Sequence, residues 1–114
     1  MPDCIFCKII DGEIPSEKVY EDSDVLAFRD IAPQAPQHIV IIPKKHIKSA
    51  NELAEDTAEV VGKVFLAAGK IAKELGFAEN GYRIVNNCGE DGGQTVGHLH
   101  FHLLAGRQMS DARA

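Results

Sequence analysis

Three histidines occupy alternate positions near the end of the chain: His98, His100 and His102. The residues between them are apolar: Leu99, Phe101 and Leu103. Because successive side chains of a strand point to opposite faces, a strand here would present imidazoles on one face and an apolar surface on the other. The apolar face would pack on a core. Folding alone does not require three aligned imidazoles, so the pattern predicts a functional site.

Two kinds of chemistry suit such a row of imidazoles. Histidines two apart on a strand can share one metal ion. Alternatively, one imidazole attacks phosphorus as a nucleophile while its neighbours donate hydrogen bonds. The segment immediately before the row, residues 87–97, contains four glycines, and glycines let backbone N–H groups approach a phosphate. The position of this loop favours chemistry at phosphorus.

Cys4 and Cys7 form a CxxC motif, which on its own is compatible with a redox pair, a metal site or an incidental spacing. No thioredoxin-like βαβ pattern surrounds the motif, so a redox role is not expected. A tetrahedral zinc site would need two further ligands. The chain has three cysteines, an odd number, so we expect reduced thiols and a cytoplasmic protein rather than a disulfide framework.

The charge balance limits the possible partners. The formal net charge of the 114 residues is −5, which argues against broad electrostatic binding to nucleic acids or to anionic membranes. A small anionic ligand in a local site remains compatible with this charge. No stretch approaches the roughly 20 apolar residues of a membrane span, and the first residues do not resemble a secretory signal.

Periodicity predicts the elements that position these residues. We expect a short helix over residues 5–10 and strands over 19–21, 25–28, 38–42, 82–86 and 98–104. One long helix is expected from about residue 52 to 75, with Asn51 as its N-cap and Gly76 at its end. Short connections favour an antiparallel sheet of about five strands with the long helix on one face. The sequence contains no linker, so residues 1–114 are expected to form a single α+β domain.

Gly62 and Gly69 lie seven residues apart and therefore share one face of the long helix. They are either two tolerated glycines or the place where another helix approaches closely, for instance across a dimer.

The motif at residues 98–104, HLHFHLL, resembles the signature of the histidine triad (HIT) family, in its nucleotide-binding branch. The resemblance extends to the segments at residues 5–16, 26–47 and 86–109. It implies a HIT-like fold and a homodimer that joins two sheets into one. It also implies binding of purine nucleoside monophosphates and cleavage of P–N bonds in adenosine or guanosine 5′-phosphoramidates, without an organic cofactor.

The resemblance assigns roles to individual histidines. His100 would be the nucleophile that forms a nucleotidyl intermediate, with its opposite ring nitrogen donating to a carbonyl. His102 would donate to the phosphoryl oxygens. His38 matches an additional histidine near this site, which would support the row; otherwise it is a histidine at the start of a strand.

The resemblance also implies a nucleotide pocket. Asp30 would bind the ribose hydroxyls, and five apolar residues would form the slot for the base. Other positions match residues that contact the phosphate and the leaving group. The full predicted set is Ile5, Phe6, Ile9, Phe28, Asp30, Ile31, Asn87, Gly93, Gln94 and Thr95, together with His100 and His102. Arg29 stands where some relatives carry histidine, which leaves the approach to the sugar open.

Bacterial HIT proteins with the same CxxC suggest a structural zinc site. Its four ligands would be Cys4, Cys7, His46 and His98. This assignment removes His98 from direct catalysis. The alternative is a pair of reduced, partly buried thiols.

Two other function classes remain open at this point. The chain could be a non-catalytic module that binds purine nucleotides or proteins, although binding alone does not need the nucleophile His100. It could also be a nucleotidyl transferase, in which a second substrate replaces water at the same intermediate.

Overall fold

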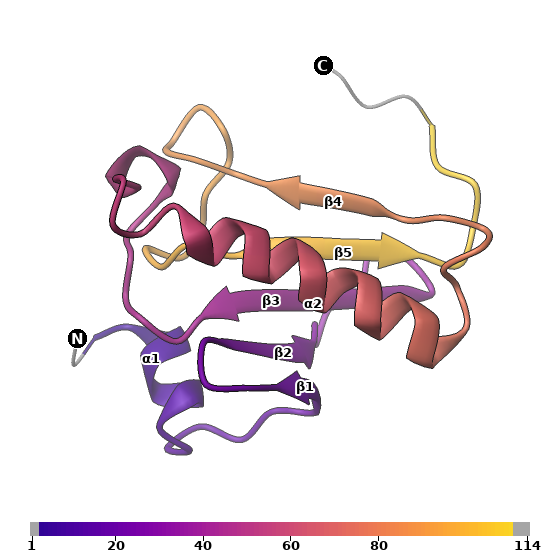
Figure 1. Cartoon of the computed structure of the whole chain (residues 1–114), viewed down its shortest axis with the longest axis horizontal. Helices are drawn as coiled ribbons and strands as arrows, with labels where there is room; N and C mark the ends of the chain where they lie inside the picture. The colour runs from indigo at the N-terminus through magenta and orange to yellow at the C-terminus, as the bar shows by residue number, and fades with distance from the viewer. Residues whose placement is uncertain (1–2, 111–114) are drawn as a thin grey trace.

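The computed structural model describes residues 3–110, which form a five-stranded antiparallel sheet with helices on both faces (Figure 1). The helices are α1 (Ile5–Ile10) and α2 (Glu59–Leu75), with a 3₁₀ turn, η1 (Ala50–Glu52), between them. The strands are β1 (Lys18–Glu21), β2 (Val25–Arg29), β3 (Gln37–Pro43), β4 (Arg83–Asn86) and β5 (Phe101–Ala105). The sheet order is β1-β2-β3-β5-β4, which confirms the predicted architecture.

Alternation along the central strands creates two cores. Ile39 and Ile41 of β3 are completely buried on the side of α2, where Val64 and Ile71 of the helix pack. The alternate residues Val40 and Ile42 belong to a smaller cluster on the other face. That cluster includes Phe6 and Ile9 of α1. The long helix therefore supports the sheet from one face, while the short helix packs on the opposite face.

The beginning of the long helix differs from the prediction. Residues 50–52 form the 3₁₀ turn η1, which is capped by the Ser49 hydroxyl, and α2 begins only at Glu59. Between them, the Thr57 hydroxyl accepts a hydrogen bond from the Ala54 amide at 2.9 Å. Side chains of this kind compete with the backbone bonds of a helix, which explains why residues 52–58 turn instead of extending α2. Gly76 ends α2 as predicted, in the left-handed conformation with φ 86°.

The last strand begins later than predicted, at Phe101 rather than His98. The partner strand β3 pairs with β5 from Gln37 to Ile41, and further pairing would reach Pro43. Proline has no N–H to donate to a ladder, so residues 98–100 are held by individual hydrogen bonds instead. The predicted alternation nevertheless holds: Leu99, Phe101 and Leu103 all belong to the core beneath α2.

Among residues 3–110, no helix combines the length and apolar content that a membrane crossing requires.

Candidate active site and metal cluster

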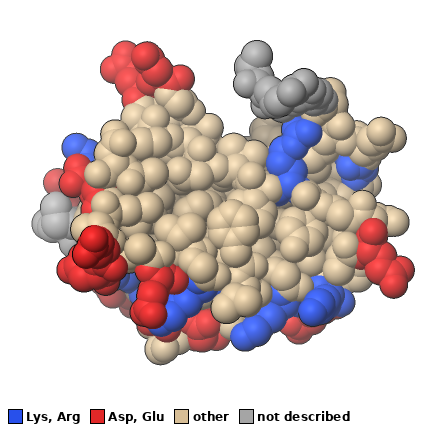
Figure 2. Space-filling model, turned by 45° about the horizontal axis from the view of Figure 1, so that its top comes forward, with Lys and Arg blue, Asp and Glu red and all other residues tan. Residues whose placement is uncertain are grey.

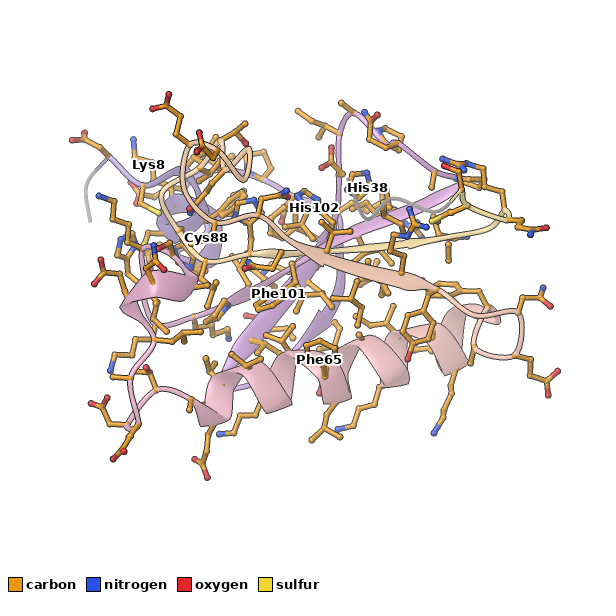
Figure 3. The ribbon with its side chains drawn as sticks, turned by 90° about the horizontal axis from the view of Figure 1, so that it is seen from above. Lys8, His38, Phe65, Cys88, Phe101 and His102 are labelled. Atoms are coloured by element: carbon orange, nitrogen blue, oxygen red, sulfur yellow. The ribbon has the colours of Figure 1, made fainter. Side chains whose placement is uncertain are left out.

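The histidine row lies on the face of the sheet opposite α2. Figure 3 shows His38 and His102 on that side, whereas Phe101 faces Phe65 of the helix. The rings of His100 and His102 are 5.2 Å apart, and His102 lies 5.1 Å from His38 on the neighbouring strand β3. His100 also packs edge-on against Phe6 of α1 at 5.1 Å. The structure therefore brings the three predicted catalytic histidines together.

A backbone carbonyl holds the His100 ring. Its Nδ1 lies 2.7 Å from the carbonyl oxygen of His98, and a carbonyl can only accept, so Nδ1 must carry the proton. In the neutral imidazole, Nε2 then carries a lone pair. The side-chain amide of Asn86 donates to the His100 carbonyl at 2.9 Å and holds the backbone. The predicted hydrogen bond between the His100 ring and a carbonyl is present.

A second chain of hydrogen bonds determines the tautomers of His38 and His102. The backbone N–H of Gln34 donates to Nδ1 of His38 at 3.0 Å, so in neutral His38 the proton is on Nε2. That Nε2 lies 2.9 Å from Nδ1 of His102 and donates to it. His102 in turn carries its proton on Nε2. The hydrogen-bond chain from Gln34 thus leaves an Nε2–H donor on His102. The neighbouring ring of His100 carries a lone pair on its own Nε2.

The surroundings of His38 and His102 favour their neutral forms. Burial lowers the pKa of His38 below its ordinary value, and the nearby carboxylate of Asp30 only partly offsets this. Burial also lowers the pKa of His102, with further lowering from His100 and His38. Both rings are therefore favoured in the neutral form, and the hydrogen bonds described above determine which nitrogen carries the proton.

Asp30 lies beside this chain. Its Oδ1 accepts the backbone N–H of Ala32 at 2.8 Å, and its Oδ2 is 3.5 Å from Nε2 of His38. The side chain is 23% exposed, so a ligand can still reach the carboxylate. The location is compatible with the predicted contact to ribose hydroxyls, and Asp30 additionally acts on the pKa of His38.

The predicted apolar slot is only partly assembled. Phe6, Ile9 and Phe28 are buried together in the smaller core cluster. Ile5 and Ile31 are exposed and do not belong to this cluster.

The glycine-rich loop is held by its own amides. Asn87 donates to the Gly92 carbonyl at 2.8 Å. The Gln94 amide bridges the loop to the rest of the chain, donating to the carbonyls of Lys48 and Val96 at 2.8 and 2.9 Å. Gln94 therefore shapes the loop in this structure, while Gly93 and Thr95 remain exposed for a ligand.

Cys4, Cys7, His46 and His98 converge in a second cluster, and one atom from each lies within 4.8 Å of all the others. Nδ1 of His98 is 3.2 Å from Nδ1 of His46 and 3.3 Å from Sγ of Cys4. Sγ of Cys7 is 3.3 Å from Nδ1 of His46 and 3.6 Å from Nδ1 of His98. The four predicted ligands are thus assembled in a group that could hold a metal ion.

The chemistry of His98 fits a metal ligand. Its Nε2 donates to the Pro43 carbonyl at 2.9 Å, so the neutral ring carries a lone pair on Nδ1. Burial also lowers the pKa of His98, which favours this neutral form. One lone pair cannot accept hydrogen bonds from three neighbours at once, but it can bind one cation that the other three atoms also bind.

Two positioning groups were not predicted. Asn86 fixes the His100 carbonyl, and the Gln34 backbone N–H fixes His38. Asn86 directly precedes the predicted residue Asn87, and nothing in the sequence distinguishes the two amides. The contribution of Gln34 is a main-chain group, which no residue type reveals.

A row of neighbouring histidines beside a glycine-rich loop, on a five-stranded antiparallel sheet, is typical of histidine triad proteins. The family model described as "HIT domain" matches residues 11–109. The chain belongs to the HIT family.

Several relatives are similar over nearly the whole chain. Purine nucleoside phosphoramidase of Escherichia coli K12 is 50% identical over 105 residues, which cover 92% of this chain and 88% of that protein. A histidine triad protein from Clostridium difficile has 51% identity and a TM-score of 0.96, with 99% of this chain and 98% of that chain covered. A HIT family hydrolase from Legionella pneumophila has 52% identity and a TM-score of 0.92, with 95% and 96% covered.

Proposed function

We propose that the chain is a purine nucleoside phosphoramidase that hydrolyses the P–N bond of adenosine or guanosine 5′-phosphoramidates. The observation that carries the proposal is the tautomer of His100: the 2.7 Å bond from Nδ1 to the His98 carbonyl leaves the lone pair on Nε2. The name of the Escherichia coli relative supports the reaction class. Attack on phosphorus by an imidazole requires the neutral ring, with a lone pair on the attacking nitrogen.

The proposed reaction has two steps. Nε2 of His100 attacks the α-phosphorus, the P–N bond breaks, and the amine leaves after taking up a proton. Water then attacks phosphorus and breaks the bond to Nε2, releasing the nucleoside monophosphate and the restored imidazole. The Nε2–H of His102 donates to the phosphoryl oxygens as their negative charge increases. His38 acts through His102 and is a positioning residue.

The remaining predicted residues would bind the nucleotide. The Asp30 carboxylate would accept hydrogen bonds from the ribose hydroxyls. The exposed side chains of Ile5 and Ile31, together with the buried Phe6, Ile9 and Phe28, would form the slot for the base. Backbone N–H groups around Gly93 and the hydroxyl of Thr95 would contact the phosphate and the leaving group.

We further propose that the cysteine–histidine cluster binds a structural zinc ion. Zn–S bonds of about 2.3 Å and Zn–N bonds of about 2.05 Å place tetrahedral ligand atoms roughly 3.3–3.8 Å apart. The distances between ligand atoms given above lie between 3.2 and 3.6 Å. All four ligands come from the protein, so the ion would stabilise the fold rather than bind water.

The protein is also proposed to form a homodimer that joins two sheets. β4 is an edge strand of the sheet, so its outer side can pair with a second copy. Next to it, α2 exposes Phe65 and Leu66, on the same face as Gly62 and Gly69. Figure 2 shows a broad uncharged surface on this side of the molecule, with charged side chains around its margin.

Steady-state hydrolysis of adenosine 5′-phosphoramidate by wild type and by His100→Ala tests the proposed activity. Loss of the nucleophile should lower kcat by about a thousand-fold or more. Hydrolysis that survives the substitution would contradict the proposed mechanism. Nucleotide binding without turnover in the wild type would identify a binding module instead. Transfer of the nucleotide to an added phosphate acceptor in preference to water would identify a transferase.

A further inference from the structure

We propose that His98 couples the metal cluster to the nucleophile. Its side chain belongs to the metal cluster, and its backbone carbonyl determines which nitrogen of His100 carries a proton. The proposal rests on the function proposed above for His100. It makes His98 a positioning residue and gives the cluster a role in the chemistry beyond anchoring α1.

The side chain of His98 is fixed at both ring nitrogens. Nε2 donates to the Pro43 carbonyl at 2.9 Å, and Nδ1 faces His46 at 3.2 Å and Cys4 at 3.3 Å. The side chain of His98 is completely buried. A cation bound by Nδ1 would therefore fix the orientation of the ring and, with it, the position of the residue.

The backbone of His98 leads directly to the nucleophile. Its carbonyl oxygen accepts the Nδ1–H of His100 at 2.7 Å. The next residue, Leu99, donates its N–H to the Ile47 carbonyl at 2.6 Å. The segment from Pro43 to Ile47 thus makes three contacts with residues 98 and 99. The Pro43 carbonyl accepts from the His98 ring, His46 faces His98 in the metal cluster, and the Ile47 carbonyl accepts from the Leu99 N–H. A single residue, Leu99, separates the cluster ligand His98 from His100 in the chain.

Loss of the metal would remove the second of these contacts, the one through the cluster. The lone pair on Nδ1 of His98 would then face three neighbouring atoms and could accept a hydrogen bond from only one of them. The ring would then reorient, and the carbonyl of His98 would move with its residue. Without the carbonyl at hydrogen-bond distance, the proton of His100 would be distributed between both ring nitrogens. The form with a proton on Nε2 cannot attack phosphorus.

A cluster that only anchors α1 would have a different effect. Phe6 of α1 packs against both His98 and His100, with ring centroids 5.9 and 5.1 Å apart. Release of α1 would therefore open the base side of the pocket and weaken nucleotide binding, while leaving the carbonyl of His98 in place. The two accounts differ in the tautomer of His100 and in whether kcat or KM changes.

The test uses protein labelled with ¹⁵N at histidine, in which long-range ¹H–¹⁵N spectra identify the protonated nitrogen of His100. Spectra are compared at one pH for zinc-loaded wild type, chelator-treated wild type, the same sample reloaded with zinc, and Cys7→Ser. Circular dichroism checks that each sample is folded, and zinc content is measured. Cys88→Ser serves as the matched control, because Cys88 is a free cysteine outside the cluster.

We expect the Nδ1–H form of His100 in loaded wild type and in Cys88→Ser. Chelated wild type and Cys7→Ser should show both tautomers, and kcat should fall about ten-fold or more, as is typical for a lost supporting contact, with KM within about two-fold. Reloading with zinc should restore both the spectrum and kcat. If Cys7→Ser does not fold, chelation and reloading of the wild type decide the question.

Three results would overturn the coupling. The first is an unchanged Nδ1–H form in folded, zinc-free protein. The second is a change in KM alone, which would indicate that the cluster only anchors α1. The third is complete unfolding of wild type on chelation, which would show that the metal supports the whole fold rather than His98. A loaded protein with the expected spectrum but no phosphoramidate hydrolysis would contradict the proposed function and leave the coupling intact.

Discussion

At the scale of single residues, His38 determines which nitrogen of His102 carries the proton that the proposed mechanism donates to a phosphate. The backbone N–H of Gln34 occupies Nδ1 of His38, so Nε2 of His38 donates to Nδ1 of His102 at 2.9 Å. Only then does the proton of His102 lie on Nε2. The order of donors is fixed before a substrate arrives, which is the condition for effective stabilisation of developing charge.

Substitution of His38 should therefore reduce turnover through His102. In His38→Ala, Nδ1 of His102 loses its donor, and we expect kcat for adenosine 5′-phosphoramidate to fall about ten-fold or more. In His38→Gln, the side-chain amide can supply an N–H to the same nitrogen, so kcat should recover in part. Steady-state kinetics of the two variants provide the measurement. Equal losses in both variants would argue against control of the tautomer.

The pH dependence of stability provides a second prediction for the same pair. Burial lowers the pKa of His38 and of His102 below the ordinary value of 6.5. Well above pH 6.5 both imidazoles are neutral in the folded and unfolded chain, so neither contributes to a change of stability there. As the pH falls below 6.5, the unfolded chain binds protons that the fold excludes, so the free energy of unfolding decreases.

Urea denaturation at pH 7.5 and pH 5.5 measures this decrease. It should be larger in wild type than in His38→Gln, which lacks one of the two histidines. Because the metal ligands are identical in both proteins, their own protonation contributes equally and cancels in the comparison. An equal decrease in the two proteins would show that His38 does not carry the effect.

At the scale of elements, the stability of α1 depends on its packing against the sheet and on the metal cluster. It has six residues, fewer than an isolated helix needs for stability in water. Phe6 and Ile9 bury its inner face, and its N-cap residue Cys4 belongs to the metal cluster. The helix and the cluster therefore stabilise one another.

Metal removal should accordingly lower the thermal midpoint of unfolding. Each kcal/mol lost corresponds to roughly 4 °C for a chain of this size, and we expect a decrease of several degrees on chelation. Differential scanning calorimetry with and without chelator measures it. The same chelator should have little effect on Cys7→Ser, which already lacks one ligand. A comparable decrease in that variant would show that chelation acts elsewhere.

The sequence predicted which helices and strands form better than it predicted the residues at which they begin and end. The alternation of His and apolar residues over residues 98–103 correctly indicated two faces, because one of them is fully buried beneath α2. Helical periodicity correctly ended α2 at Leu75, where Gly76 adopts a left-handed conformation. The start of α2 was wrong because the Thr57 hydroxyl bonds the Ala54 backbone, and such local competition is not visible in a hydrophobic pattern.

The site was predictable to a similar degree. The histidines and cysteines were identified by type and spacing together with the family resemblance, and the structure assembles them. The tautomers were not predictable, because they depend on two main-chain groups, the backbone N–H of Gln34 and the carbonyl of His98. The two groups act on the imidazoles only when the loop before β3 and the segment before β5 have adopted their folded conformations.

At the scale of the whole molecule, the proposed dimer places an apolar surface in contact with its copy. Leu66 is 67% exposed and Phe65 is 50% exposed, on a helix that otherwise packs on its own sheet. Leu66→Glu should therefore convert a dimer to monomers, because a carboxylate would be buried without a partner. Light scattering after size-exclusion chromatography measures the mass. Ala54→Glu, which adds the same charge at an exposed turn position, should leave it unchanged.

The same molar mass for wild type and Leu66→Glu would contradict a dimer that forms through this face of α2. A monomeric but active Leu66→Glu protein would show that each copy carries a complete site.

The most direct test of the central claim, a nucleotidyl intermediate on His100, is mass spectrometry after rapid quenching with adenosine 5′-phosphoramidate. Wild type should gain the mass of one AMP group, mapped to the peptide that contains His100, because Nε2 of this ring carries the lone pair. His100→Ala should gain none. Steady turnover by wild type with the adduct on another residue, or with an equal adduct in His100→Ala, would contradict the claim.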